Sequence, residues 1–175
     1  ICLLTAPSGA GKSSLLRWMA GLETPGLHAS GQVRLGGQIL SDLPAERRQL
    51  GLLFQTPQLF PHLTVADNLG FGLVPSVTGA ARTNAITDAL DKAGLAGMGL
   101  RDPHTLSGGQ QARLALLRTL LARPQALLLD EPFSSLDGVR REEMVKLVLE
   151  EAAERKLPVL LVSHDPRDEA LTDKP

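Results

Sequence analysis

The sequence is poor in cysteine and in long hydrophobic runs. Its single cysteine excludes a disulfide within the chain. Cys2 lies in the apolar run ICLL, which predicts a buried packing residue rather than a reactive thiol. The apolar runs ALLLD and LPVLLVS are much shorter than the about 18–20 residues that span a bilayer. Any connection to a membrane is therefore expected to run through a partner.

The sequence also lacks an excess of charge of either sign. Its formal net charge is −1, with 21% charged and 43% hydrophobic residues. This balance is ordinary for a globular protein of the cytosol with a mixed-charge surface. It provides no excess of basic residues for binding nucleic acid. A length of 175 residues suits one domain, or one domain with an insert.

The two ends of the sequence predict a fragment, or a natively trimmed version, of a longer protein. The chain begins with Ile1 rather than methionine, inside a predicted strand, and it ends at Pro175 shortly after another strand-like run. No signal peptide is visible, although a missing N-terminal segment would hide one.

Four short apolar runs predict strands buried in a parallel sheet, namely ICLLT, LGLLFQ, ALLLD and LPVLLVS. Segments with helical periodicity separate these runs. The first such helix is expected to pack through Leu15, Leu16, Met19 and Leu22. Residues 31–40 alternate and break at glycines, which predicts a short antiparallel hairpin. Strands that alternate with helices indicate an α/β domain with a mainly parallel sheet.

The stretch from Thr56 to about Gly99 predicts a small helical insert. Thr64, followed three residues later by Asp67, is a helix-capping signal. The run NAITDALDKAGL is typical of an amphipathic helix that ends in glycine.

The stretch SGAGKS, residues 8–13, is typical of a phosphate-binding loop because it lies between a predicted strand and a predicted helix. Gly9 and Gly11 allow backbone N–H groups to close around a β-phosphate. Lys12 would lie between the β- and γ-phosphates, and the Ser13 hydroxyl would ligate Mg²⁺. The candidate nucleotide-binding residues are Ser8, Gly9, Ala10, Gly11, Lys12, Ser13 and Ser14.

The pattern departs from a standard phosphate loop at its first glycine, which is Ala6 here. An alanine fits this position without cost if its φ is negative. If the backbone there needs a positive φ, the strain is about 1–2 kcal/mol.

Two carboxylates follow the strand-like run ALLL. Asp130 is expected at the C-terminal end of that strand, where ligands bind in open parallel sheets, and Glu131 comes next. Asp130 is suited to holding Mg²⁺ through water, opposite Ser13. Glu131 is suited to accepting a proton from an attacking water.

Two further polar residues are expected at strand ends. His164 follows LLVS, and its neutral imidazole is suited to a hydrogen bond with a γ-phosphate or to holding the water. Gln55 follows LGLLF, and its amide is suited to binding Mg²⁺ or water without adding charge.

A second glycine pair lies in LSGGQQAR, residues 106–113, at the start of a long predicted helix that runs from Ser107 to about Ala122. The N–H groups of a helix N-terminus form an anion site. The candidate phosphate contacts here are Ser107, Gly108, Gly109 and Gln110.

With these motifs in one order, the sequence resembles the nucleotide-binding subunits of ATP-binding cassette (ABC) transporters over nearly its whole length. The matching motifs are SGAGKS (Walker A), Gln55 (Q-loop), LSGGQ at 106–110 (signature), ALLLDEP (Walker B), SSLD at 134–137 (D-loop) and His164 (switch histidine). The run FQTPQLFPHLTVADNLGFGL resembles the Q-loop region of bacterial importer subunits of the thiamine, ferric-iron and polyamine types.

The resemblance implies a P-loop NTPase fold of the α/β class, with a mainly parallel sheet, a short antiparallel β hairpin and an inserted helical subdomain. It implies a single domain over residues 1–175, in which 1–56 and 119–175 form the P-loop core and 57–118 the helical subdomain with the signature motif. The implied roles are catalysis by Glu131, His164 and Gln55, metal binding by Ser13, Gln55 and Asp130, and a nucleotide contact by Asp137.

The resemblance also implies ATP and Mg²⁺ as cofactors, and ATP hydrolysis that powers solute transport through a separate permease. A solute-binding protein is a further expected partner, and no nucleic acid is expected. Two copies would pack as a homodimer with ATP at the interface, each ATP held by Walker A of one copy and the signature of the other. The expected location is the cytoplasmic face of the bacterial inner membrane, as a peripheral subunit.

Two alternatives stay open. Non-transport ABC ATPases of DNA repair or translation typically carry long coiled coils or two paired cassettes, whereas the insert here is compact. The second alternative is a truncated cassette that binds ATP without hydrolysing it. The family's adenine-stacking aromatic residue would precede Ile1, the sequence has no tyrosine, and most of the family's closing elements after His164 are missing.

Overall fold

A four-stranded parallel sheet forms the centre of the protein in a computed structural model that describes residues 1–7 and 9–172. The strand order is β1-β6-β5-β4, with β1 at Cys2–Leu4, β6 at Val159–Val162, β5 at Ala126–Asp130 and β4 at Leu50–Leu53. Each neighbouring pair is parallel. The predicted hairpin is present as β2 (Arg34–Leu35) and β3 (Gln38–Ile39). The predicted α/β class with a mainly parallel sheet is confirmed.

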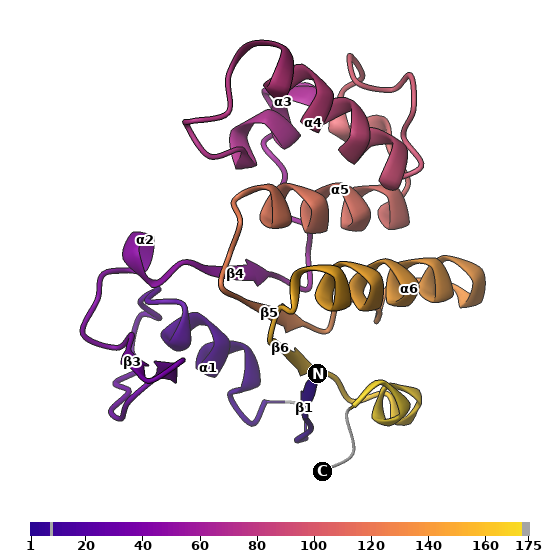
Figure 1. Ribbon diagram of the computed structural model, residues 1–175. Coiled ribbons are helices and arrows are strands. Elements are labelled where there is room, and N and C mark those ends of the chain that lie inside the picture. Colours follow the sequence, from indigo (N-terminus) through magenta and orange to yellow (C-terminus); the bar gives the residue numbers. More distant parts are fainter. Residues whose placement is uncertain (8, 173–175) are drawn as a thin grey trace.

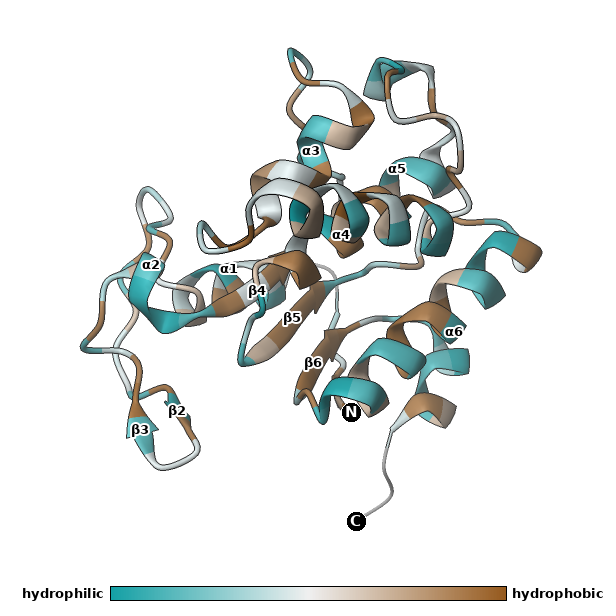
Figure 2. Cartoon of the chain, turned by 45° about the horizontal axis from the view of Figure 1, so that its top comes forward, coloured by the Kyte–Doolittle hydropathy of each residue, from teal (hydrophilic) through white to brown (hydrophobic). Residues whose placement is uncertain are grey.

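The strands are more deeply buried at the centre of the sheet than at its β1 edge. All residues of β5 are buried, and Figure 2 shows β5 and β6 as hydrophobic segments. Cys2 is exposed, so the prediction that it is a buried packing residue is wrong. The reason is that β1 is an edge strand, and Cys2 borders a hollow of about 180 Å³ beside Leu128 and Leu160.

Helices cover both faces of the sheet (Figure 1). Successive strand residues point to opposite faces, so the continuous apolar strands present apolar side chains on both. Helix α1 (Lys12–Met19) lies on one face, where Leu16 packs with Leu128 and Val162. Helices α5 (Gly108–Leu121) and α6 (Gly138–Arg155) lie on the other face, where they share a core with Leu127 and Leu129. The predicted helix from Ser107 to about Ala122 is confirmed.

The predicted apolar stripe of α1 is only partly correct. Leu16 is fully buried, but Leu15 and Leu22 are 39% and 36% exposed. The helix ends at Met19 because Gly21 adopts a left-handed φ of 83°, which places Leu22 outside the helix. A Cβ at Gly21 would also lie 2.9 Å from the Cα of Ala45, so the close approach there requires glycine.

Helices α3 (Val65–Gly72) and α4 (Gly79–Lys92) pack over α5 at one end of the molecule (Figure 1). The predicted cap of α3 is confirmed, since the Thr64 hydroxyl accepts a hydrogen bond from the Asp67 N–H at 3.1 Å. Helix α4 begins earlier than the predicted NAITDALDKAGL segment, and Gly94 follows its end with a φ of 67°. The buried residues of these helices belong to the same hydrophobic core as the sheet face under α5 and α6.

The remaining elements are short. Helix α2 spans Ala45–Arg48, and two 3-10 helices, η1 and η2, span Pro103–Thr105 and Pro166–Leu171. Within residues 1–7 and 9–172, no helix combines the length and the hydropathy that crossing a membrane requires.

Candidate nucleotide-binding site

The loop after β1 and the ends of three parallel strands line one pocket of about 590 Å³. Because β4, β5 and β6 run parallel, the residues that follow them meet at the same edge of the sheet. This phosphate pocket is lined by Ala6, Pro7, Gly9, Gly11, Lys12, Ser13, Ser14, Gln55, Glu131 and His164. The structure therefore brings Gln55, Glu131 and His164 together with most of the predicted phosphate loop.

The phosphate loop curls around its lysine. Gly9 and Gly11 adopt left-handed φ values of 80° and 86°, which glycine tolerates without strain. Lys12 is only 9% exposed, and its Nζ donates hydrogen bonds to the carbonyl oxygens of Ala6 (2.6 Å) and Pro7 (3.1 Å). The ammonium is thus fixed by the loop itself at the pocket.

Three residues of the loop differ from the others in what the structure shows of them. Ser8 lies outside the described residues. Ala10 is exposed next to the pocket. Ala6 is not among the non-glycine residues of the described chain with a positive φ, so its Cβ brings no left-handed strain.

Glu131 and His164 form a pair at the pocket. The His164 Nδ1 lies 2.9 Å from the Glu131 Oε1, and the two side chains are 65% and 16% exposed. The Glu131 N–H donates to the carbonyl of Val162, the last residue of β6, at 2.9 Å. Glu131 adopts a left-handed φ of 46° just after β5 ends. Such strain in a non-glycine residue costs about 1–3 kcal/mol and tends to occur where function requires it.

Of the three candidate metal ligands, two line the phosphate pocket and one does not. Ser13 and Gln55 line the phosphate pocket, and Gln55 lies two residues beyond the end of β4, slightly later than predicted. Asp130 is the last residue of β5, as predicted, and is only 6% exposed, but it does not line the pocket.

The second glycine pair lies outside the phosphate pocket of its own chain. Ser107 caps α5 in a reciprocal capping box: its hydroxyl accepts from the Gln110 N–H at 3.4 Å, and the Gln110 side-chain oxygen accepts from the Ser107 N–H at 2.9 Å. Gly108 is exposed, whereas Gly109 is buried against the Arg140 side chain.

Asp137 also lies outside this pocket and caps α6. Its carboxylate accepts from the Arg140 N–H at 3.2 Å and lies 3.1 Å from the Arg140 guanidinium. The signature segment (106–110) and the D-loop segment (134–137) therefore both contact Arg140. Neither segment lines the phosphate pocket of its own chain.

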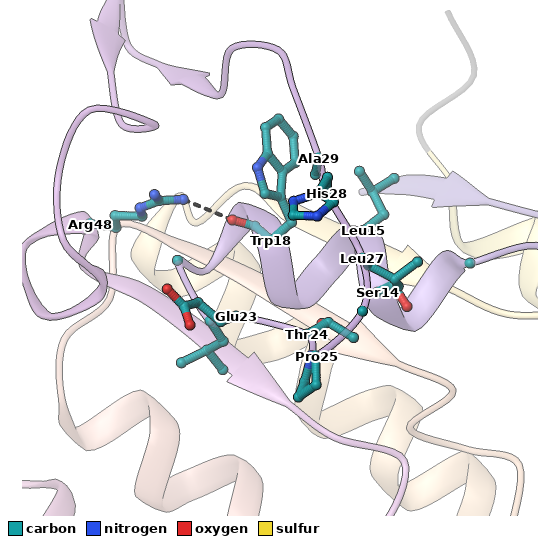
Figure 3. Close-up of a pocket in the computed structure, with 14 residues that line it drawn as sticks. Ser14, Leu15, Trp18, Glu23, Thr24, Pro25, Leu27, His28, Ala29 and Arg48 are labelled. Atoms are coloured by element: carbon teal, nitrogen blue, oxygen red, sulfur yellow. Dashed lines mark hydrogen bonds between the residues drawn. The ribbon is translucent and has the colours of Figure 1, made fainter.

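The sequence did not reveal a second, larger hollow beside the phosphate loop. This outer cavity, of about 890 Å³, lies between α1 and the segment that follows it, and it shares Gly11 and Ser14 with the phosphate pocket. Figure 3 shows Trp18 on its wall. Trp18 lies four residues after Ser14, so the two share one face of α1. This helical spacing is the sequence signal that could have placed Trp18 near the phosphate loop. Arg48 fixes the end of α1 by donating to the carbonyls of Trp18 and Met19 at 2.8 and 2.9 Å.

Comparisons with known proteins match this architecture. The family description "ABC transporter" matches residues 1–134. The uncharacterized ABC transporter ATP-binding protein YnjD of Escherichia coli (strain K12) is 46% identical over 168 residues, which cover 96% of this chain and 77% of that protein. The thiamine import ATP-binding protein ThiQ of Cereibacter sphaeroides is 49% identical over 163 residues, covering 93% and 69%. The Fe(3+) ions import ATP-binding protein FbpC of Pseudomonas fluorescens (strain Pf0-1) is 47% identical over 175 residues, covering 97% and 48%.

Solved structures agree with the sequence relatives. The ATP-binding cassette MJ0796, solved as a dimer in a post-hydrolysis state bound to ADP and Pi, is similar with a TM-score of 0.80 and 29% identity, over 95% of this chain and 75% of that chain. The P-loop NTPase fold is thereby confirmed. The chain belongs to the ABC transporter family and is one of its ATPases.

Proposed function

We propose that this protein hydrolyses ATP to power the import of a solute through a separate membrane permease. The phosphate pocket carries the proposal, because it joins a phosphate loop built around Lys12 to the Glu131–His164 pair. Relatives at 47–49% identity whose names specify the import of thiamine or Fe(3+) ions support an importer. The subunit would then lie at the cytoplasmic face of the membrane, held there by its permease.

Lys12 supplies the cation for the phosphates of ATP. In the structure its ammonium donates to the neutral carbonyls of Ala6 and Pro7. Charged phosphate oxygens form stronger, charge-assisted hydrogen bonds with an ammonium than carbonyls do. The outer cavity, which shares Gly11 and Ser14 with the phosphate pocket, leaves room for the nucleoside end.

The donor chemistry of the site fits Mg²⁺. The Ser13 hydroxyl, the Gln55 amide oxygen and the Asp130 carboxylate are hard oxygen donors, with Asp130 acting through water. Among the described residues, no three His, Cys, Asp or Glu side chains gather around a metal position. The nucleotide phosphates would therefore supply further ligands, as Mg²⁺ usually requires. When bound, the ion neutralises charge on the β- and γ-phosphates.

Glu131 acts as the general base. Its carboxylate lies at the pocket and accepts the proton of the water that attacks the γ-phosphate. His164, 2.9 Å from the carboxylate, holds it in place and presents its other ring nitrogen to the γ-phosphate or the water. Gln55, which follows the neighbouring strand β4, orients the water.

The active species we propose is a homodimer. Ser107, Gly108, Gly109, Gln110 and Asp137 lie outside the phosphate pocket of their own chain. The first N–H groups of a helix lack carbonyl partners within the helix, and Gly108 leaves this end of α5 open to solvent. A second copy would therefore contribute its signature to the γ-phosphate bound here. In this arrangement residues 57–118 form the helical subdomain, and a solute-binding protein delivers the cargo to the permease.

The nucleotide site is tested by ATP turnover in Mg²⁺ and in EDTA, for the parent protein and for Lys12→Ala. We expect turnover only with Mg²⁺, and loss of both turnover and ATP binding in Lys12→Ala, since the phosphates lose the loop's cation. Turnover in EDTA, or unchanged ATP affinity of Lys12→Ala by calorimetric titration, would contradict the assignment.

A further inference from the structure

A buried ion pair joins α6 to the segment that follows His164. Arg141, in the first turn of α6, pairs through its terminal guanidinium nitrogen with the Asp168 carboxylate in η2. Arg141 is 8% exposed and Asp168 only 1%. The two residues are 27 positions apart, so the contact fixes the 3-10 helix η2 onto α6.

Arg141 makes two further contacts. Its guanidinium carbon lies 5.6 Å from the centre of the Phe133 ring, a cation–π distance. Its Nε lies 3.7 Å from the Asp165 carboxylate, and this buried nitrogen has no hydrogen-bond partner among the described residues. One buried cation therefore touches both the loop after β5 and the loop after β6.

These two contacts flank the Glu131–His164 pair. Phe133 is 4% exposed and comes two residues after Glu131. Asp165 directly follows His164. The His164 ring is itself 65% exposed, so its position depends on its backbone and on its contact with Glu131.

The backbone beside His164 is itself tied to this cluster. The Asp165 N–H donates to the Ser163 hydroxyl at 3.0 Å, and the Asp168 N–H donates to the Asp165 carbonyl at 3.0 Å. Hydrogen bonds from the Arg167 side chain and backbone hold the pKa of Asp165 well below its usual range, so Asp165 keeps its charge beside Arg141.

We propose that Arg141, paired with Asp168, is a positioning residue that sets the distance and orientation between Glu131 and His164. The inference rests on the proposed function of that pair. Arg141 touches neither side chain of the pair; it fixes the loops that carry them, through Phe133 on one side and through Asp165 and Asp168 on the other.

Stability alone does not account for this pair. Replacing a buried ion pair by apolar residues of similar size is often neutral or stabilising, whereas removing one partner leaves a costly unpaired charge. The double variant Arg141→Met/Asp168→Leu is therefore expected to fold, and it removes the geometric link without stranding a charge. Asp165 keeps its partner Arg167 in this variant.

A second ion pair on α6, in which one partner is buried, provides a control. Glu151, 2% exposed, pairs with Arg155 at 2.8 Å and with Lys92 at 2.5 Å, away from the phosphate pocket. The control variant Glu151→Leu/Arg155→Met removes an ion pair with one buried partner, Glu151, from the same helix. It does not touch the loops that carry Glu131 and His164.

The test combines ATP turnover with the histidine ring signals in a ¹H–¹³C NMR spectrum, where His164→Ala identifies the His164 signal among the four histidines. In Arg141→Met/Asp168→Leu we expect the His164 signal alone to move. Turnover should fall by about tenfold to a hundredfold, which is the scale of a misplaced catalytic group. ATP affinity should stay within about threefold of the parent, because the loop around Lys12 is untouched. The control variant should leave the His164 signal and the turnover as they are.

An unmoved His164 signal in the folded double variant would overturn the inference, as would parental turnover. If the double variant does not fold, Arg141→Lys decides through the same signal, since lysine keeps the charge but loses the planar guanidinium. Absence of ATP turnover in the parent protein would instead count against the proposed function, and the NMR signal would still decide the role of Arg141.

Discussion

Lys12, Glu131 and His164 lie in or just after the loops that follow three parallel strands, and neighbouring groups of the chain hold each of them. Lys12 donates to two loop carbonyls, while Glu131 and His164 hold each other at 2.9 Å. Such preorganised groups need little rearrangement when charge develops in the transition state. At the level of single residues, these contacts support the phosphoryl chemistry proposed for the pocket.

Ala6 is expected to be tolerated in the phosphate loop. Because Ala6 has no left-handed φ, the variant Ala6→Gly should tighten ATP binding by less than about tenfold, or about 1.4 kcal/mol. Trp18, the single tryptophan, lies on the wall of the neighbouring outer cavity, so its fluorescence is a convenient readout.

Gly9→Ala is the matched control for Ala6→Gly. Gly9 has a φ of 80°, and a Cβ there would meet no atom within 4 Å, so the substitution adds backbone strain of about 1–2 kcal/mol without a clash. We expect weaker ATP binding in this variant. A gain much above tenfold for Ala6→Gly would show that alanine distorts the loop.

Part of this site could be predicted from the sequence, because each candidate follows an apolar run short enough to be a strand. Parallel strands align their C-terminal ends, so Glu131 and His164 were expected at one edge of the sheet. The role of Arg141 could not be predicted in this way. Its partners lie in two other segments, and only the fold brings Phe133, Asp165 and Asp168 to it.

At the scale of elements, the contact between α3 and α5 fixes the helical region onto the core. Gly72, the last residue of α3, lies so close to α5 that an added Cβ would overlap the carbonyl oxygen of Arg118. The Arg118 side chain reaches back to the segment before α3, donating to the Gln58 carbonyl at 2.6 Å and lying 4.9 Å from the Phe60 ring centre.

Gly72→Ala is expected to lower the free energy of unfolding by about 1–3 kcal/mol, since overpacking forces the two helices apart. Urea denaturation followed by circular dichroism measures this change. The control is Gly138→Ala at the start of α6, where a Cβ would meet nothing within 4 Å. Equal stability of the two variants would show that the α3–α5 approach is not as close as the structure has it.

The elements that could be predicted are those whose signal lies within a few neighbouring residues of the sequence. The hairpin at 31–40 follows from alternation and glycines, and the start of α3 follows from Thr64 and Asp67. The exposure of Cys2 could not be predicted, since an apolar run does not reveal whether its strand lies at the edge of the sheet. The early end of α1 depends on the close approach of Ala45 to Gly21, a contact between distant segments.

In the molecule as a whole, two candidate anion-binding segments lie in separate places on one chain. The phosphate loop lines the pocket, whereas Ser107 and its glycines cap α5 elsewhere. A chain that binds one nucleotide has no use for both unless a second copy completes the site. This separation supports the homodimer proposed above as the unit that hydrolyses ATP.

Ser107→Arg is expected to bind ATP like the parent protein but to fail in ATP-dependent dimerisation and in turnover. The arginine would fill the space that a phosphate of the partner's nucleotide requires. Size-exclusion chromatography with ATP measures dimerisation, and Thr64→Arg is the matched control because it replaces another helix cap away from the phosphate pocket.

A mixture of Ser107→Arg with Lys12→Ala sharpens this prediction. A mixed dimer would contain one intact composite site, so turnover should return although each variant alone is inactive. Normal turnover by Ser107→Arg alone would contradict a site shared between two copies.

The variant Glu131→Gln shows whether the phosphate pocket hydrolyses ATP with Glu131 as its base. The amide keeps the size of the side chain and its neighbours but cannot accept the proton. We expect ATP affinity within about threefold of the parent. Turnover should be lower by about 10²–10⁴-fold, the usual contribution of a general base. Turnover close to that of the parent, measured with Mg²⁺ at saturating ATP, would contradict the account.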